Sequence, residues 1–276
     1  MEANSQLDVE LSRAFANEQE KLQEIYDDAQ LLLKRTHKDH FDLLVVLGSG
    51  LLEAADLIGE IEETLPFFDI PGVKDPAVEG HGHNIFSVNY EGKNILVYTG
   101  RSHLYEDLDP YTLCLPVRVA AATGIKAAFL TNAGGCLRDW NLGELMAISD
   151  HMNFSGASPF NGPVFTDISG VWDKELLETI SPLADRQGVY AMFRGPEYQT
   201  VAESKFLQMI GVDNVGMSTI LEAMALHQLG VKVSGVSVVS DLSFAEEIAS
   251  QETVIKAVQS SIPKIVEIVQ AIAREL

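Results

Sequence analysis

Two short segments of the sequence combine basic side chains with glycine. Residues 80–83 read GHGH, and residues 100–107 read GRSHLYED directly after the apolar run ILVY. In the second segment Arg101 and His103 alternate, so both side chains can point into one pocket. Arginine offers a planar fork of donors that matches phosphate oxygens, and histidine adds a donor that can carry charge. The alternative is that these basic residues are solvated cations of surface loops. Basic residues are scarce in this chain, so their clustering in two segments argues against that alternative.

Small and polar residues also follow several apolar runs. Residues 47–51 read LGSGL, where two glycines let the backbone approach an anion closely and Ser49 adds a hydroxyl donor. Residues 131–135 read TNAGG, and residues 237–243 read SVVSDLS, which brings Asp241 to the end of a strand. Each segment alone is also explained as a turn. Ligands bind at the carboxyl ends of parallel strands, however, so the recurrence of these segments predicts one shared crevice.

These segments need a framework that brings them together. Helical spacing of apolar residues predicts an amphipathic helix over 6–36, which can break once, and another over 252–275. Strands and helices are expected to alternate between them, with strands at 43–47, 95–98, 127–130, 189–193 and 231–239 and helices at 111–122, 200–210 and 219–229. This alternation predicts an α/β fold, with one domain over 1–276 and a central, mostly parallel mixed sheet flanked by helices on both faces. A long loop is expected at 153–166, a length that is typical of functional loops.

The composition narrows the classes of protein. The chain has 19 Lys and Arg against 40 Asp and Glu, and this charge of −21 repels nucleic acid, so any phosphate site must be a local basic pocket. Cys114 and Cys136 form no CxxC pair and no HExxH segment occurs, so we predict no metal site and a cytoplasmic location. We expect no membrane association, because no signal-peptide pattern and no apolar stretch near the ~20 residues of a bilayer span occur.

Taken in order, the motifs resemble those of a known family. GSGL, GHGHNIFSV, GRSHLYED, TNAGG, LGELM, GPEYQTVAE and GMSTILEA look like the trimeric class of the purine nucleoside phosphorylases, over about residues 43–245. The resemblance implies the phosphorylase-like α/β fold and a homotrimer with its sites at the interfaces. It also implies phosphate-dependent cleavage of the bond between a purine and its (deoxy)ribose. Inorganic phosphate is then a co-substrate, and no metal or organic cofactor is implied.

The resemblance further implies a role for each matching residue. The phosphate site would consist of Ser49, His81, Arg101, His103, the backbone N–H of Ala133, and Ser218. The sugar would contact Tyr105, Met217 and, from the neighbouring subunit, Phe165. The base would lie against Tyr198, between Gln199 and Asp241. The catalytic residues would be His103 at the phosphate and Asp241, which protonates or hydrogen-bonds N7 of the leaving purine.

Two of the base-site positions depart from the family pattern. Relatives specific for 6-oxopurines carry Glu and Asn there, whereas this chain has Gln199 and Asp241. An ionised Asp241 accepts a bond from the 6-amino group of adenine, and Gln199 can donate to adenine N1, so our hypothesis is that adenosine is accepted. The alternative is that Asp241 is protonated and Gln199 turns its carbonyl towards N1–H, which would retain 6-oxopurine substrates.

Two other functions compete with this interpretation. A 5′-methylthioadenosine phosphorylase shares the fold and uses an Asp for the adenine amino group, although its phosphate segment differs from GRSHLYED. A non-catalytic nucleoside-binding protein is a second alternative, although it would need no acid chemistry at the leaving group. At the 5′ end of the sugar, Gln251 stands where the family has a histidine. The alternative is that Gln251 is only a surface residue of a helix.

Overall fold

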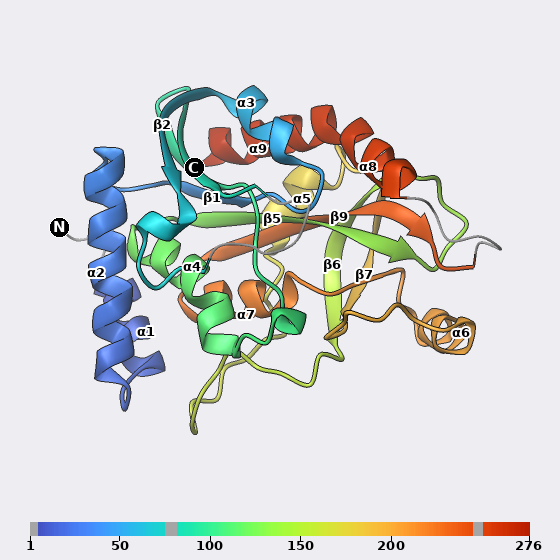
Figure 1. The fold of residues 1–276 in the computed structure, drawn as a ribbon, viewed down its shortest axis with the longest axis horizontal. Helices are drawn as coiled ribbons and strands as arrows, with labels where there is room; N and C mark the ends of the chain where they lie inside the picture. The colour runs from blue at the N-terminus through green and yellow to red at the C-terminus, as the bar shows by residue number, and fades with distance from the viewer. Residues whose placement is uncertain (1–4, 75–81, 245–250) are drawn as a thin grey trace.

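The computed structural model describes residues 5–74, 82–244 and 251–276 of the chain (Figure 1). His81, predicted for the phosphate site, lies outside the described residues, as does Gly80 of the GHGH segment. All the other residues predicted for the site are within the described ranges.

One sheet organises the described part of the chain. Its nine strands are ordered β2-β3-β4-β1-β5-β8-β7-β6-β9. They are β1 (Leu43–Val46), β2 (Glu60–Pro66), β3 (Asn84–Tyr90), β4 (Lys93–Tyr98), β5 (Ala127–Cys136), β6 (Leu145–Asn153), β7 (Arg186–Met192), β8 (Asn214–Gly216) and β9 (Lys232–Leu242). Parallel pairing joins β4, β1, β5 and β9, whereas β2, β3 and β4 are antiparallel neighbours.

The two longest strands give the sheet an unusual shape. β5 pairs with β9 as well as with β8, so β5, β8, β7, β6 and β9 form a closed ring of strands. The long β5–β9 ladder runs through the middle of the molecule in Figure 1. Ring closure brings the carboxyl ends of β5 and β9 next to β8, which is the crevice that the polar strand ends predict.

Helices cover both faces of the sheet. They are α1 (Ser5–Ala14), α2 (Gln19–Thr36), α3 (Ala55–Ile58), α4 (Pro110–Ala122), α5 (Lys174–Ile180), α6 (Val201–Met209), α7 (Ile220–Gln228), α8 (Gln251–Ser260) and α9 (Ile262–Glu275). Side chains of β1 alternate between two cores, as the pleat requires. Leu44 and Val46 pack with α2, α4 and α7, and Leu43 and Val45 pack with α3, α5 and α9. The predicted α/β fold with helices on both faces is therefore confirmed.

The N-terminal and C-terminal helices differ in how well the sequence predicts them. The expected helix over 6–36 is α1 and α2, with the anticipated single break between them. The expected helix over 252–275 is instead two helices, α8 and α9, because Pro263 lacks an N–H and its ring clashes with the preceding turn. The buried stripe of α9 still follows helical spacing, since Ile265, Ile268, Val269 and Ile272 are all fully buried.

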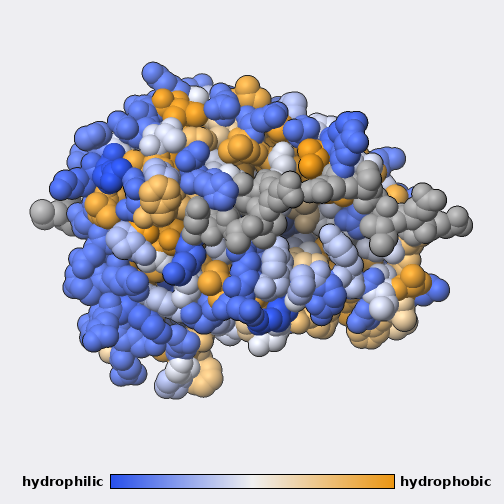
Figure 2. Space-filling model, viewed as in Figure 1, coloured by the Kyte–Doolittle hydropathy of each residue, from blue (hydrophilic) through white to orange (hydrophobic). Residues whose placement is uncertain are grey.

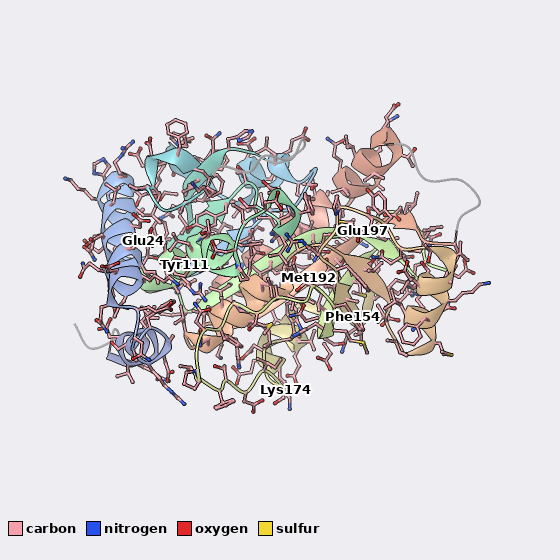
Figure 3. The ribbon with its side chains drawn as sticks, turned by 60° about the horizontal axis from the view of Figure 1, so that its bottom comes forward. Glu24, Tyr111, Phe154, Lys174, Met192 and Glu197 are labelled. Atoms are coloured by element: carbon pink, nitrogen blue, oxygen red, sulfur yellow. The ribbon has the colours of Figure 1, made fainter. Side chains whose placement is uncertain are left out.

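The N-terminal helices pack against the rest of the molecule through buried rings and polar bonds. Tyr26 on α2 donates to Asp8 on α1 at 2.7 Å, which joins the two helices. Tyr111 at the start of α4 donates to Glu24 on α2 at 2.6 Å, and Figure 3 shows these two side chains meeting. The face in Figure 2 is mostly hydrophilic over this end of the molecule. Among the described helices, none combines the length and apolar character that crossing a membrane requires.

Candidate active site

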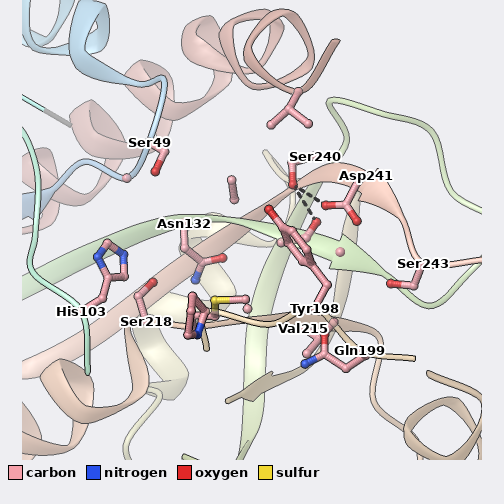
Figure 4. Close-up of a pocket in the computed structure, with 18 of the residues that line it drawn as sticks. Ser49, His103, Asn132, Tyr198, Gln199, Val215, Ser218, Ser240, Asp241 and Ser243 are labelled. Atoms are coloured by element: carbon pink, nitrogen blue, oxygen red, sulfur yellow. Dashed lines mark hydrogen bonds between the residues drawn. The ribbon is translucent and has the colours of Figure 1, made fainter. Parts of the chain in front are cut away.

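A cavity of about 480 Å³ opens at the strand ends, and Figure 4 shows its lining. Its walls come from the loop after β1, the segment after β4, the distal halves of β5 and β9, β8, and the segment before α6. Among the described residues, all those predicted for the site except Phe165 line it, namely Ser49, Arg101, His103, Tyr105, Ala133, Tyr198, Gln199, Met217, Ser218 and Asp241. The fold thus brings together side chains that lie far apart in the sequence.

Arg101 is held from two sides at the inner end of the cavity. Its side chain is buried, and it donates through Nη1 to the carbonyl of Thr131 on β5. Its Nε lies 2.9 Å from Oε2 of Glu222 on α7, and both side chains of this ion pair are buried. Thr131 in turn accepts a bond from Gly48 N at 2.9 Å, so the guanidinium and the LGSGL loop share one anchor on β5.

The LGSGL loop lies directly against β5. A Cβ atom at Gly48 would stand 2.9 Å from the carbonyl oxygen of Thr131 and 3.0 Å from Cα of Asn132, so only glycine allows this approach. Ser49, the next residue, lines the cavity on the same side as His103 and Ser218 (Figure 4). The interpretation of LGSGL as a loop that brings backbone and hydroxyl donors close to a ligand fits this geometry.

His103 is oriented by a carboxylate three residues along the chain. Oε1 of Glu106 accepts from the backbone N–H of His103 at 2.6 Å and lies 3.0 Å from Nδ1 of the ring. A carboxylate at Nδ1 requires a proton there, which leaves Nε2 to accept when the ring is neutral and to donate when it is charged. The ring also stacks on Tyr105, with centroids 4.7 Å apart, so both aromatic rings are fixed at the cavity wall.

Ser218 lies at the start of α7, beside a buried polar network. Its Oγ is 3.2 Å from Oγ1 of Thr219, which accepts from Nδ2 of Asn132 at 3.0 Å. Oδ1 of Asn132 accepts from Ser237 at 2.6 Å, so the orientation of the amide is set by both partners. Thr219 has φ of 79°, a costly conformation for a β-branched residue, which this network stabilises.

The opposite end of the cavity is built around Asp241. Oγ of Ser240 lies 3.0 Å from Oδ1 of Asp241 and 3.1 Å from the carbonyl oxygen of Gly134. A hydroxyl has one proton, and the carbonyl can only accept, so a protonated Asp241 that donates to Ser240 satisfies both contacts at once. Burial raises the pKa of Asp241, against a smaller lowering by the Ser240 bond. Burial outweighs the Ser240 bond and favours a carboxyl that takes up a proton readily.

The predicted sugar and base residues come from the segments before α6 and α7, together with Tyr105 from the segment after β4. Gly195 has φ of +74°, and a Cβ there would lie 2.4 Å from Sδ of Met217 and 2.9 Å from Tyr105. Glycine therefore lets this segment close against the two predicted sugar contacts. The following residues Tyr198 and Gln199 reach the cavity near Asp241, and Tyr198 remains 75% exposed (Figure 4).

Phe165 lies away from this cavity. It is 91% exposed and borders a second, smaller cavity of about 300 Å³ beside α1. This placement cannot bring it to the site of its own subunit, and it leaves the ring available to a neighbouring molecule. The prediction for Phe165 concerns a neighbouring subunit and stays a prediction.

Several residues of the site were not singled out from the sequence. Glu222 stands within GMSTILEA, and its signal was a lone carboxylate in an otherwise apolar helix. Asn132 and Ser240 lie inside recognised motifs without having been assigned a role. Val254 on α8 also lines the cavity and carried no signal, because an apolar helix residue is ordinarily part of a core. Within the described ranges, no cluster of three or more His, Cys, Asp or Glu side chains is placed to hold a metal ion.

The fold and the site together define a class of protein. The sequence of residues 42–274, which includes the sheet and the cavity at its strand ends, matches the family model described as the Phosphorylase superfamily. Because this match spans most of the chain, the protein belongs to the phosphorylase superfamily. The helices α1 and α2 precede the matched residues.

Individual relatives specify the branch of the superfamily. The purine nucleoside phosphorylase of Cellulomonas sp is 38% identical over 257 residues, covering 89% of this chain and 91% of the relative. That of Mycobacterium tuberculosis is 40% identical over 219 residues, covering 78% and 81%. The crystal structure of Schistosoma mansoni purine nucleoside phosphorylase in complex with adenosine superposes with a TM-score of 0.81 at 27% identity, covering 91% of this chain and 96% of that one. The resemblance to the purine nucleoside phosphorylases is confirmed.

Proposed function

We propose that this protein is a purine nucleoside phosphorylase, which uses inorganic phosphate to release a free purine and (deoxy)ribose 1-phosphate. The observation that carries the proposal is the single cavity, with Arg101 and His103 at one end and Gln199 and Asp241 at the other. A nucleoside laid between these ends has its sugar between a phosphate site and a base site. The relatives named above are all purine nucleoside phosphorylases, which favours this activity over that of a 5′-methylthioadenosine phosphorylase.

The geometry supports a mechanism based on positioning and charge. Phosphate, held by Arg101, His103, Ser49, Ser218 and the N–H of Ala133, attacks C1′ as the bond from C1′ to N9 breaks. The sugar becomes oxocarbenium-like, and the adjacent phosphate stabilises its positive charge. Holding the three parts in line lowers the entropic part of the barrier. The electron pair of the broken bond goes to the purine. Its N7 takes a proton or a strong hydrogen bond from Asp241 when Oδ2 carries a proton, and from solvent when Oδ2 accepts from the base. These steps use no metal or organic cofactor.

The base site supports acceptance of adenosine. Oδ1 of Asp241 is engaged by Ser240, which leaves Oδ2 for the base. When Asp241 is ionised, or when its proton lies on Oδ1 towards Ser240, Oδ2 is an acceptor and matches the 6-amino group of adenine. Gln199 can donate to N1 of the same base. A proton on Oδ2 would instead match O6 or N7 of a 6-oxopurine, so the substrate preference reports where this proton lies.

The test is the release of free base from adenosine, inosine and guanosine, each with and without phosphate. We expect phosphate-dependent cleavage of adenosine by the wild-type protein and its loss in Arg101→Met. If only inosine and guanosine are cleaved, the proposed phosphorylase activity stands and the proposed preference for amino-purines is overturned. No phosphate-dependent cleavage of any of the three would overturn the proposed function, and binding without turnover would then indicate a nucleoside-binding protein.

The same proposal includes a homotrimer in the cytoplasm. Phe165 is 91% exposed, so its ring is accessible to a neighbouring subunit, as the proposed completion of the sugar site requires. The two free, buried cysteines are consistent with a reducing compartment.

A further inference from the structure

The carboxylate that pairs with Arg101 lies behind the cavity wall. Glu222 is only 4% exposed and is absent from the residues that line the cavity, yet its Oε2 lies 2.9 Å from Nε of Arg101. It therefore cannot touch a bound phosphate directly, and its carboxylate would repel one if it did. Its effect on the cavity must pass through the guanidinium.

We infer that Glu222 is a positioning residue that aims Arg101 at phosphate, an inference that rests on the proposed function. A guanidinium is planar, and its Nε and Nη donors point in different directions. Glu222 forms a close ion pair with the Nε edge, without an aligned Nε–H···Oε2 hydrogen bond, and Nη1 donates to the carbonyl of Thr131. Together, the charge attraction of Glu222 and the bond to Thr131 restrain the orientation of the guanidinium plane. The bidentate geometry that phosphate requires is then set before phosphate arrives.

The position of Glu222 on α7 links two parts of the proposed phosphate site. Ser218 and Thr219 lead directly into the first turn of this helix, and Glu222 follows within that turn. The first turn is fixed to β5 through the bond from Asn132 to Thr219. Arg101, from the segment after β4, is therefore placed relative to Ser218 by a side chain of the helix that Ser218 precedes. Charge balance contributes as well, because a buried guanidinium is retained more readily beside a carboxylate.

The test is the Glu222→Gln variant, which keeps the volume of the side chain and one acceptor but removes the charge. Phosphate binding is measured by calorimetry and the KM values of phosphate and nucleoside by kinetics. We expect phosphate affinity to fall about tenfold, the loss of one charge-assisted contact, with the KM of the nucleoside changed by less than about twofold. An unchanged or tighter affinity for phosphate would overturn the inference, as would an equal rise in both KM values.

Two controls separate positioning from a general loss of structure. Asp213→Asn removes the carboxylate of another ion pair, with Arg138 at 2.6 Å, away from the cavity, and should leave phosphate affinity unchanged. If Glu222 acts through Arg101, then Arg101→Met and the double variant Arg101→Met/Glu222→Met bind phosphate equally. A further loss in the double variant would overturn the inference even if Glu222→Gln does not fold. If the wild type cleaves no nucleoside, calorimetry still tests Glu222, so the two failures are distinguishable.

Discussion

At the scale of single residues, the proposed base site holds Gln199 and Asp241, where the family resemblance leads us to expect Glu and Asn in enzymes specific for 6-oxopurines. Gln has nearly the shape of Glu, and Asp has nearly the shape of Asn. Their donors and acceptors are what differ. A site with buried polar groups discriminates strongly, because the wrong substrate leaves those groups unpaired.

The first prediction is therefore a reversal of specificity. The double variant Gln199→Glu/Asp241→Asn should lose activity on adenosine and gain it on inosine, so that the ratio of the two kcat/KM values changes by about a hundredfold or more. Each single variant should give a smaller change, since it corrects only one edge of the base. Steady-state kinetics on both nucleosides provides the measurement, and a ratio that stays constant would show that these side chains do not read the base.

A second residue-scale prediction concerns pH. Burial raises the pKa of Asp241 above the value of about 3.9 expected in the unfolded chain, so between these two values the native state binds more protons. Stability contributed by this group is present below the unfolded pKa and is lost as pH rises through the native pKa. Asp241→Asn removes the cost of ionisation, and its Oδ1 can still accept from Ser240.

Asp241→Asn should accordingly unfold at a higher temperature than the wild type at pH 7, and the difference should disappear near pH 4. Thermal unfolding across this range measures it. A variant that is less stable than the wild type at pH 7 would show that ionised Asp241 is stabilised in the native protein by contacts stronger than its burial cost.

At the scale of elements, Arg118 on α4 ties the N-terminal helices to the long loop. Its guanidinium is buried, donates to the carbonyl of Pro159 at 2.6 Å, and lies over the rings of Phe15 and Tyr111. Nearby, Asn161 donates to Glu18 at 3.3 Å. The loop that carries Phe165 is thus held by Arg118, within the part of the chain matched by the family model, and by Glu18, which precedes that part.

We predict that Arg118→Met loosens this loop. The carbonyl of Pro159 loses its charged donor, so local opening of residues 154–162 should become about tenfold more frequent. Amide hydrogen exchange followed by mass spectrometry measures the change, with Arg138→Met as a control that removes an arginine elsewhere. If both variants exchange at the same rate as the wild type, Arg118 does not hold the loop.

At the scale of the whole molecule, the placement of Phe165 makes the proposed trimer testable. An exposed side chain contributes little to folding, so Phe165→Ala should change the free energy of unfolding of a subunit by less than about 0.5 kcal/mol. The same change should raise the KM of the nucleoside about tenfold, because the ring is proposed to cover the sugar of a neighbouring site.

Mixed oligomers separate action between subunits from action within one. When Phe165→Ala and Arg101→Met subunits are unfolded and refolded together, some sites combine an intact Arg101 with a neighbour's intact Phe165. The mixture should then show more activity at low nucleoside concentration than the two variants measured apart. No gain in a mixture that sedimentation shows to be trimeric would place the action of Phe165 elsewhere.

Much of this protein follows from the sequence by itself. Apolar runs predict β1, β4, β5 and β9, because a strand covered on both faces must be apolar throughout. Polar and glycine residues mark the ends of these strands. The family resemblance implied the site residues, and the described ones, except Phe165, line one cavity. Such features are local, so neighbouring residues suffice to reveal them.

Only the tertiary structure decided which partners these residues meet. The closure of the ring by β5 and β9, the pairing of Arg101 with Glu222 and the contact of Arg118 with Pro159 all join distant parts of the chain. Residue type and spacing do not specify such contacts, because several buried carboxylates or carbonyls could satisfy the same guanidinium. The choice among them is made by packing, which sets the distance between elements and hence which side chains come within reach.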